Sequence, residues 1–308
     1  AGLVALGLAP NLPAYLAAWV VIGIDMGAGL YDAAFATLGR LYGADARAAI
    51  TNLTLIAGFS STVCWPLSAF FVQSLGWRGT CLAYAALQLL LALPVHLRLV
   101  PRLPAARTGG DGLGPPHSQP SAAASRDGSI RLLLLATGLT VATVIQSMVA
   151  VHLLTILQAR GLDLAAAVGL GALVGPAQVA ARVIEKLLGA RFHPIWTMLA
   201  SAVLLAAGLT LLRAGPPATA IALGLYGAGA GIFSIARGTL PLALFGASGY
   251  AALMGRLALP MLIAGALAPS AGALLLARAG ADATLAALAG LAAANIALMV
   301  GLRLRLAA

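Results

Sequence analysis

Apolar runs of about 20 residues, the length that an α-helix needs to cross a bilayer, recur along most of the chain. The runs are continuous and do not alternate apolar with polar positions, so they predict helices rather than the strands of a membrane β-barrel. Short segments containing Pro, Gly, Asn or Arg separate them. The predicted spans are 13–38, 48–73, 78–97, 132–158, 164–188, 194–213, 218–244, 250–276 and 283–302, with a partial span at 1–9.

The composition supports this pattern. Hydrophobic residues make up 61% of the 308 residues and charged residues only 8%, with a mean hydropathy of +1.00. A soluble domain carries about 25% charged residues. We therefore predict an all-α, polytopic membrane helix bundle, because a helix satisfies its own backbone hydrogen bonds in lipid.

One long polar segment interrupts the apolar runs. Residues 98–131 include PRLPAARTGGDGLGPPHSQP and are rich in Pro, Gly and Ser, which is typical of a flexible linker. The segment divides the chain into an incomplete N-terminal transmembrane bundle at 1–97 and a six-helix C-terminal bundle at 132–308. Residues 1–9 are too short for a full span and lack an initial Met, so we expect the chain to be an N-terminally truncated fragment.

The basic residues predict the orientation, because Lys and Arg favour the cytoplasmic ends of spans. The net charge of +10 is dispersed at the ends of apolar runs, which is unlike a nucleic-acid-binding patch. One set of alternating ends holds Arg40, Arg47, Arg98, Arg102, Arg107, Arg126, Arg131, Lys186, Arg191, Arg303 and Arg305. The opposite set holds Arg78, Arg160, Arg213 and Arg278. The linker and the C-terminus are thus predicted in the cytoplasm, with the protein in a cell inner membrane.

An internal comparison indicates two related halves. The segment GAGLYDAAFATLGRLYG (27–43) aligns with GAGIFSIARGTLPLALFG (229–246). The aligned pairs are Gly27 with Gly229, Gly29 with Gly231, Gly43 with Gly246, Pro66 with Pro269, and Gly76 with Gly280, at offsets of 202 to 204. Gly and Pro determine helix packing and helix breaks rather than hydrophobicity alone. We therefore predict two pseudo-symmetric six-helix halves, the first of them incomplete, which is a known transporter plan.

This plan, with its long cytoplasmic linker, resembles the major facilitator superfamily. LGWRGTCLAY (75–84) is similar to the turn between the fifth and sixth helices of many members. EKLLGARFHP (185–194) resembles the acidic-basic-glycine loop that follows the eighth helix, and 41–66 resembles the entry to the fifth. The tract from GLYDAAFATLGRLYG through GWRGT is most similar to bacterial monocarboxylate-type transporters. The resemblance implies twelve helices, of which 13–38 is the fourth, and transport by alternating access.

The segment GPAQVAARVIEK (175–186) places three polar side chains on one helix face. Gln178, Arg182 and Glu185 are spaced i, i+4 and i+7. A charged residue inside a span is rare and usually faces a cavity. Arg182 could bind the anionic group of a substrate, with Gln178 adding hydrogen bonds. The alternative is an ion pair with Glu185, or a guanidinium that snorkels to the cytoplasmic surface.

Other polar residues within the spans are candidates for the transport pathway. Asp25 and Asp32 are seven residues apart and share a face of the predicted helix 13–38, so either could carry a coupling proton, and Asp25 could also contact substrate. Asp32 could instead pair with Arg40 or with another cation of the cytoplasmic third, where Arg182, Arg237 and Arg256 lie. Gln146, at the middle of 132–158, completes the predicted pathway set. His152 is predicted to be structural, and the glycines of GAGAG (227–231) to pack helices closely.

A second set of residues is predicted to form a cytoplasmic gate. By the resemblance, Glu185, Lys186 and Arg191 belong to the loop that holds one side of the transporter closed, and Arg47 is a plausible partner for Glu185. Arg256 occupies the matching place in the second half. We expect it to pair with the first copy of the loop motif, upstream of the chain.

The function favoured by the sequence is secondary active transport of a small solute, an organic anion by the Arg182 argument, coupled to a proton. A drug or metabolite efflux antiporter is the nearest alternative. An intramembrane enzyme would need a clustered catalytic set, but His96, His117, His152 and His193 are scattered. A non-transporting receptor is a third possibility. We expect no enzyme activity, cofactor or metal, and a monomer whose partners are the bilayer and its substrate.

Overall fold

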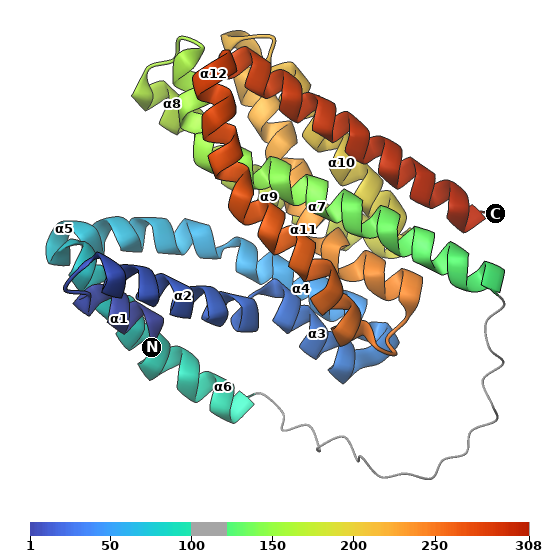
Figure 1. Ribbon diagram of the computed structural model, residues 1–308, viewed down its shortest axis with the longest axis horizontal. Helices are drawn as coiled ribbons and strands as arrows, with labels where there is room; N and C mark the ends of the chain where they lie inside the picture. Colours follow the sequence, from blue (N-terminus) through green and yellow to red (C-terminus); the bar gives the residue numbers. More distant parts are fainter. Residues whose placement is uncertain (100–121, 308) are drawn as a thin grey trace. The chain divides into compact units, whose positions relative to one another are not determined.

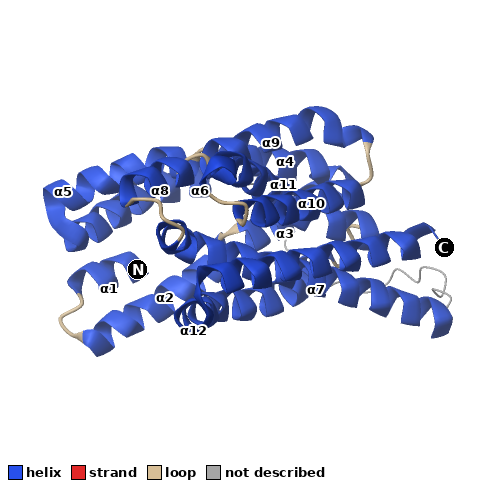
Figure 2. Cartoon of the chain, turned by 90° about the horizontal axis from the view of Figure 1, so that it is seen from above, coloured by secondary structure: helices blue, strands red, loops and turns tan. Residues whose placement is uncertain are grey.

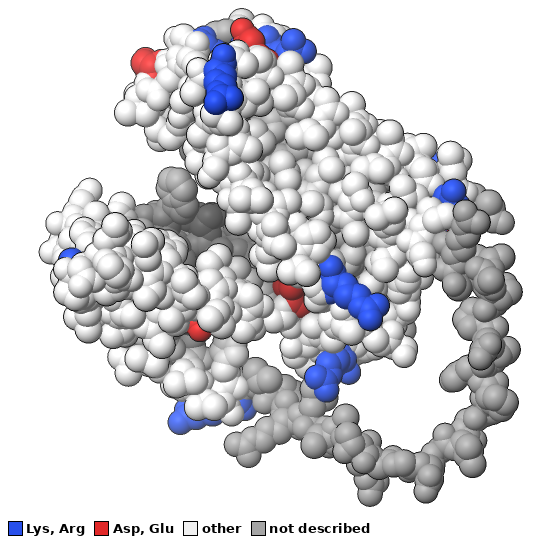
Figure 3. Space-filling model, viewed as in Figure 1, with Lys and Arg blue, Asp and Glu red and all other residues white. Residues whose placement is uncertain are grey.

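The computed structural model describes residues 1–99 and 122–307, and every regular element in these ranges is helical (Figures 1 and 2). Seven helical stretches among the described residues are long and apolar enough to cross a membrane. Most of the surface visible in Figure 3 is neither acidic nor basic. The prediction of an all-α, membrane-compatible protein is confirmed at this level.

The predicted linker lies largely outside the described residues. Positions 100–121, which include Arg102, Arg107 and His117, are not among the described residues. On its two sides the helices extend further than predicted. Helix α6 (Leu93–Leu99) continues past residue 97, and α7 (Ala122–Ala159) begins ten residues before 132.

The first predicted spans are divided more finely than the pattern suggested. After α1 (Gly2–Leu8), the predicted helix 13–38 forms α2 (Leu12–Gly29) and α3 (Tyr31–Tyr42), with Leu30 extended between them. The expectation that Asp25 and Asp32 share one continuous helix face is therefore wrong. Gly27 and Gly29 precede the break, and glycine is a poor helix former. A 3₁₀ turn, η1 (Gly43–Asp45), then leads to α4 (Ala46–Gly58).

The remaining helices follow the predicted order. Helix α5 (Ser60–Leu87) is followed by a π-helical segment, η2 (Gln88–Ala92), and α6. The predicted span 164–188 is divided into α8 (Leu164–Gly171) and α9 (Val174–Leu188), so Pro176 lies in a first helical turn, where its missing N–H is tolerated. The 3₁₀ turn η3 (Gly189–Arg191), α10 (Pro194–Leu212), η4 (Pro216–Ala218), α11 (Thr219–Phe245) and α12 (Tyr250–Ala307) complete the chain.

Two glycines break long helices in the same backbone conformation. Gly76 in α5 has φ 68° and ψ 175°, and Gly280 in α12 has φ 78° and ψ 179°. An L side chain rarely adopts a positive φ, so glycine is the residue suited to both bends. These bends fall at the predicted boundaries 73–78 and 276–283. Figure 1 shows that α12 bends sharply and that its last part then runs to the C-terminus.

The chain divides into two compact units. One contains 1–30 and 63–126, and the other contains 31–62 and 127–308. Residues 31–62, which precede the linker, belong to the second unit, because α3 and α4 pack with α9, α11 and α12. In the first unit, α1 and α2 contact each other, the rings of Tyr15 and Trp77 meet edge to face with centroids 6.4 Å apart, and the Ser68 hydroxyl lies 2.5 Å from that of Tyr84.

Glycines bring the central helices of the second unit into close contact. A Cβ atom on Gly229 of α11 would lie 2.8 Å from the amide nitrogen of Leu205 in α10. On the same face, the Ser201 hydroxyl donates to the Gly229 carbonyl at 2.8 Å. Glycines on a helix face permit this approach, so the packing interpretation of GAGAG is supported by these contacts.

Helix α7 compensates a proline in α12. Pro269 has no N–H, so the Gly265 carbonyl lacks its usual helical donor. The Ser147 hydroxyl of α7 donates to that carbonyl at 2.7 Å, and His152 Nε2 lies 2.8 Å from the Pro269 carbonyl oxygen. These bonds give His152 a structural role, because its ring also fills the space left by Gly272.

Candidate functional site

A polar cavity of about 250 Å³ lies inside the second unit. We call it the central cavity. Helices α3, α7, α9 and α11 contribute its walls. Its polar lining residues are Tyr31, Thr143, Gln146, Ser147, Gln178, Arg182, Ser234 and Arg237. Ala230 and Phe233 complete the lining. A group of amides, hydroxyls and guanidiniums within apolar helices is the kind of arrangement that binds a polar solute.

Arg182 is the most deeply buried charged residue at this site. It is only 6% exposed. Its Nε donates to the Gly231 carbonyl of α11 at 3.2 Å, and its Nη1 donates to the Thr54 carbonyl of α4 at 3.1 Å. Neither acceptor carries a formal charge. Arg182 therefore brings a positive charge to the cavity that these two bonds do not neutralise.

Local glycines explain how Arg182 reaches these carbonyls. A Cβ on Gly227 of α11 would lie 2.7 Å from the Val174 carbonyl oxygen of α9, and a Cβ on Gly231 would overlap the backbone of Gln178. The backbones of α9 and α11 are thus in contact one turn before Arg182. On α4, Gly58 leaves room for the Arg182 guanidinium, which a Cβ there would meet.

Arg237 is held differently. Its Nη2 forms an ion pair and hydrogen bond with Oδ2 of Asp32 on α3, and both side chains are less than one-fifth exposed. Asp32 Oδ1 and Arg237 Nε are buried atoms without a hydrogen-bond partner among the described residues. The pair neutralises its two charges but leaves part of its hydrogen-bonding capacity unused. Asp32 pairs with a cation of the predicted cytoplasmic third, as one of its two interpretations proposed, and not with Arg40.

Packing of α3 fixes the direction of Asp32. Phe35, one turn later, is fully buried, and a Cβ on Gly238 of α11 would lie 2.8 Å from its ring. Tyr250 of α12 fills the space left by Gly39 and donates its hydroxyl to the Gly238 carbonyl at 2.6 Å. Asp32, Phe35 and Gly39 lie on one helical face. The same face thus carries both the aromatic contact with α11 and the carboxylate that reaches Arg237.

The structure brings together three of the four predicted pathway residues. Gln146, Gln178 and Arg182 all line the central cavity. Asp25 does not line it: its side chain is exposed on α2, in the other compact unit. Neither interpretation of Arg182 included the partners that the structure gives it. The guanidinium donates to main-chain carbonyls. Within the described residues, Arg182 forms no ion pair with Glu185.

The predicted gate residues are brought together only in part. Arg47 does reach the loop after α9, but it donates to the Gly189 and Phe192 carbonyls, the second at 2.9 Å, rather than to Glu185. Glu185 Oε1 accepts the hydroxyl of Thr197 at 2.7 Å. Glu185 curls over Gly189, where a Cβ would overlap its carboxylate. The side chains of three predicted gate residues are exposed: Lys186, Arg191 and Arg256.

Sequence reasoning missed several residues of the cavity. Tyr31, Ser147 and Ser234 line the cavity but were not among the predicted pathway residues. One signal was available: Ser234 lies between Gly231 and Arg237 on α11, so it belongs to an interrupted polar stripe within an apolar helix. The carbonyl of Thr54 could not have been found, because a main-chain acceptor leaves no signature in the side-chain pattern.

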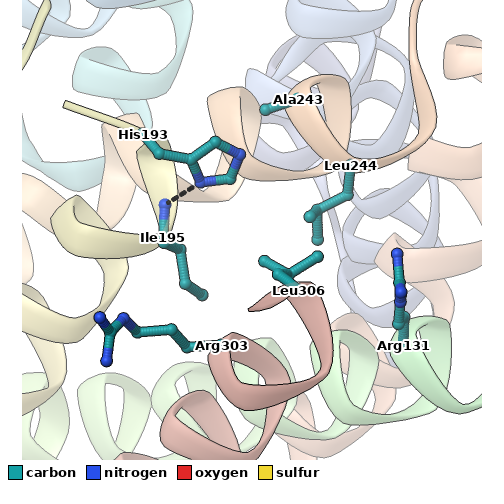
Figure 4. A pocket seen from close by; sticks show the side chains of 7 residues that line it. All are labelled: Arg131, His193, Ile195, Ala243, Leu244, Arg303 and Leu306. Carbon is teal, nitrogen blue, oxygen red and sulfur yellow. Dashed lines mark hydrogen bonds between the residues drawn. The ribbon is translucent and has the colours of Figure 1, made fainter. Parts of the chain in front are cut away.

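A second cavity, of about 410 Å³, lies where helix ends of the same unit meet (Figure 4). Arg131 and Arg303 lie on opposite sides of it, with Leu306 between them. The Arg303 guanidinium is 4.1 Å from the centroid of the Trp196 ring, so a cation–π contact already engages it. The two guanidiniums do not converge on one point, and we therefore take the central cavity as the candidate site.

His193 borders this second cavity and precedes α10. Its Nδ1 accepts the Ile195 amide at 3.2 Å, which caps the helix. Partial burial lowers the pKa of His193 below 6.5, and the positive charge of Arg47 lowers it further. The imidazole is accordingly neutral near pH 7, and the basic character of this rim comes from arginines.

The fold and cavity define an all-helical, membrane-compatible protein with an internal cationic site. Comparison with known proteins adds no narrower assignment: no protein-family model matches the chain, and no curated protein matches it.

Proposed function

We propose that the protein is a secondary transporter that carries a small organic anion across the membrane by alternating access, coupled to a proton. One observation carries the proposal. Arg182 is buried within apolar helices, lines a polar cavity and is bound by main-chain carbonyls alone among the contacts described above. A buried cation is expensive unless it is compensated, and an anionic substrate would supply the missing charge. A guanidinium also suits a carboxylate because it can donate two parallel bonds.

Backbone geometry supports the proposed plan of two six-helix halves of the major facilitator type, with the first incomplete. The aligned pair Gly76 and Gly280 has nearly the same dihedral angles, and Gly43 and Gly246 both have positive φ. Pro66 and Pro269 align at the same offset as Gly43 and Gly246, and both prolines lie inside long helices. A repeated set of breaks and bends is what duplicated halves would retain.

Three polar contacts within the second compact unit connect helices on the two sides of the linker. Arg47 bonds to the loop after α9, Arg182 bonds to Thr54 of α4, and Asp32 pairs with Arg237. Each joins a helix before the linker to one after it. We propose that the contacts of Arg47 form part of a cytoplasmic gate with Glu185, Lys186, Arg191 and Arg256, and that they break when the site opens to that side. This orientation follows the distribution of Lys and Arg, which favours a cytoplasmic C-terminus in the inner membrane.

The test is uptake of radiolabelled organic anions into proteoliposomes. Arg182→Gln should abolish uptake, and Arg182→Lys should retain only part of it, because an ammonium cannot make the two bonds of the guanidinium. The matched control is Arg278→Gln, which removes an exposed arginine near the Gly280 bend of α12. All variants are checked for folding by size exclusion and thermal unfolding in detergent.

Two results would contradict the proposal. Unchanged uptake by folded Arg182→Gln would remove the anion role of Arg182. Uptake that ignores an imposed pH gradient would remove proton coupling.

A further inference from the structure

The central cavity contains two guanidiniums but is served by one carboxylate. Arg182 and Arg237 both line it, and Asp32 reaches only Arg237. The formal charge of this group is +1 while Asp32 is ionised. A monoanion would bring the group to neutrality without any proton. A dianion would bring it to neutrality only if Asp32 also gained a proton.

The two arginines differ in how readily they can accept a substrate. The contacts of Arg182 with Gly231 and Thr54 hold it in place while leaving its charge unmatched. The Asp32–Arg237 pair leaves one buried oxygen and one buried nitrogen without a partner. Buried polar atoms that lack hydrogen bonds reduce the stability of such a pair. A substrate carboxylate that also bonded the free Nε could therefore compete with Asp32 for Arg237.

The spacing along α11 fits a short substrate. Arg182 is bound at Gly231, and Arg237 lies six residues further along the same helix, which is about 9 Å at 1.5 Å per residue. Ser234, halfway between them, also faces the cavity. This distance separates the two attachment points on α11, and two carboxylates joined by a short carbon chain, each with a hydrogen bond of about 2.9 Å to its arginine, span a length of this order.

We infer that the central cavity binds a small dicarboxylate together with one proton. One carboxylate bonds Arg182, the second replaces Asp32 at Arg237, and the proton adds to a carboxylate oxygen of Asp32. No covalent bond other than this O–H forms, and the total charge is zero before and after translocation of the loaded site. The inference rests on the proposed role of Arg182 in anion binding and adds a substrate class, a second binding residue and a stoichiometry.

The ionisable groups around Asp32 are consistent with this assignment of the proton. Arg237 faces it from α11, Tyr250 lies near both from α12, and Tyr31 precedes it on α3. Arg47 of α4 is bonded to the loop after α9. Asp32 is the one carboxylate in this set, so a proton taken up with a dianion has a single acidic acceptor here.

The test is isothermal titration of the detergent-purified protein with succinate and with butyrate, at a pH where both succinate carboxyls are ionised. Each titration is repeated in two buffers that differ in ionisation enthalpy, which counts the protons taken up. Succinate should bind with uptake of about one proton, as linkage requires, and butyrate with none. Asp32→Asn should still bind succinate but take up no proton.

The double variant Asp32→Asn/Arg237→Gln separates the second site from the first, because it removes Arg237 while the cavity keeps the single positive charge of Arg182. It should weaken succinate binding about tenfold or more, the equivalent of one charged hydrogen-bonding group, and change butyrate binding by less than about threefold. Arg278→Gln is the control for both ligands. Arg237→Lys should recover part of the succinate affinity.

Three outcomes would overturn the inference: no binding of succinate by the unmodified protein, binding without proton uptake, or equal effects of Asp32→Asn/Arg237→Gln on both ligands. The first two need no variant, so a folding defect cannot obscure them. Anion uptake that still depends on Arg182 in any of these cases would leave the proposed transport function intact. Uptake that does not depend on Arg182 would instead contradict that function.

Discussion

Helix α11 meets α9 and α3 through two different kinds of polar contact. On the α9 side, glycines bring the two backbones together and Arg182 donates to main-chain carbonyls. On the α3 side, an aromatic ring lies between the helices and the polar contact joins two charged side chains, Asp32 and Arg237. Both arginines border the same cavity, yet their local charge is balanced in one case and unbalanced in the other.

A helix bundle can thus give different roles to chemically identical side chains. A carbonyl oxygen satisfies a guanidinium's hydrogen bonds but not its charge, so an arginine held this way attracts an anion while staying in place. A carboxylate neutralises the arginine, but it can also be protonated or displaced. Arg47, which donates to two loop carbonyls, is of the first kind.

Removing one member of the Asp32–Arg237 pair should give the largest loss of stability. Asp32→Ala leaves a partly buried guanidinium without its carboxylate, which costs about 3 kcal/mol in comparable buried pairs. The double variant Asp32→Asn/Arg237→Gln should recover most of this loss, because no unpaired charge remains. The free energy of unfolding is measured in mixed micelles.

The control for this prediction is a more exposed ion pair, Arg160 with Asp282, whose acidic side chain is 80% exposed. Asp282→Ala should cost less than about 1 kcal/mol. Equal losses for Asp32→Ala and Asp282→Ala would show that the Asp32–Arg237 pair contributes no more to stability than an exposed ion pair does.

Much of the fold could be predicted because apolar length and helix-breaking residues are written directly in the sequence. The spans 194–213 and 218–244 correspond to α10 and α11 within one or two residues. The bends at Gly76 and Gly280 were expected as boundaries between spans. The break at Leu30 was not, because apolar residues continue on both sides of it and only the preceding glycines, Gly27 and Gly29, indicate it.

The site could be predicted in some of its members but not in its bonds. Rarity within an apolar span was enough to select Gln146, Gln178 and Arg182. The partners of Arg182 are carbonyls, which every residue has, so the sequence could not distinguish them. The pairing of Asp32 with Arg237 joins positions 205 residues apart, which are brought together by tertiary packing such as that of Phe35 against Gly238.

The glycine contact on the α9 side can be tested with two alanine substitutions in one helix. Gly231→Ala places a methyl group against the backbone of Gln178 and should cost about 1–3 kcal/mol, as overpacking does. Gly224→Ala has no atom within 4 Å of the new Cβ and should be neutral or stabilise by up to about 1 kcal/mol.

Unfolding free energies in mixed micelles provide the measurement for both. Uptake assays add a second measurement, because Gly231→Ala should also impair anion transport by displacing the carbonyl that binds Arg182. If Gly231→Ala and Gly224→Ala behaved alike, close contact between α9 and α11 would not explain the position of Arg182.

A smaller loss of stability is expected where an uncharged side chain donates one hydrogen bond to a carbonyl. Ser147→Ala removes the donor to the Gly265 carbonyl and should cost about 1 kcal/mol. In a Pro269→Ala background, the Gly265 carbonyl regains its helical donor, so Ser147→Ala should cost close to nothing. The difference between the two costs, measured as a double-mutant cycle, isolates the contribution of this bond. Identical costs in the two backgrounds would mean that Ser147 stabilises α7 in another way.

The smallest effect concerns Arg47, whose charge is unmatched by the carbonyls that bind it. Burial first, and Arg47 second, lower the pKa of His193 below 6.5. The unfolded chain therefore binds this proton at a higher pH than the folded protein does. Stability should be unaffected by this group above pH 6.5 and should fall as the pH is lowered from 6.5 toward the lowered pKa.

Thermal unfolding followed from about pH 7.5 to about pH 5.5, which brackets the ordinary histidine pKa, measures this slope. His193→Asn keeps a side chain that can cap α10 but cannot titrate, so it should remove the histidine's share of the slope. Arg47→Gln should reduce that share without removing it, because burial remains. An unchanged slope in Arg47→Gln would mean that the loop carbonyls screen the charge of the guanidinium. The distinction between charge-matched and carbonyl-bound arginines would then not hold for Arg47.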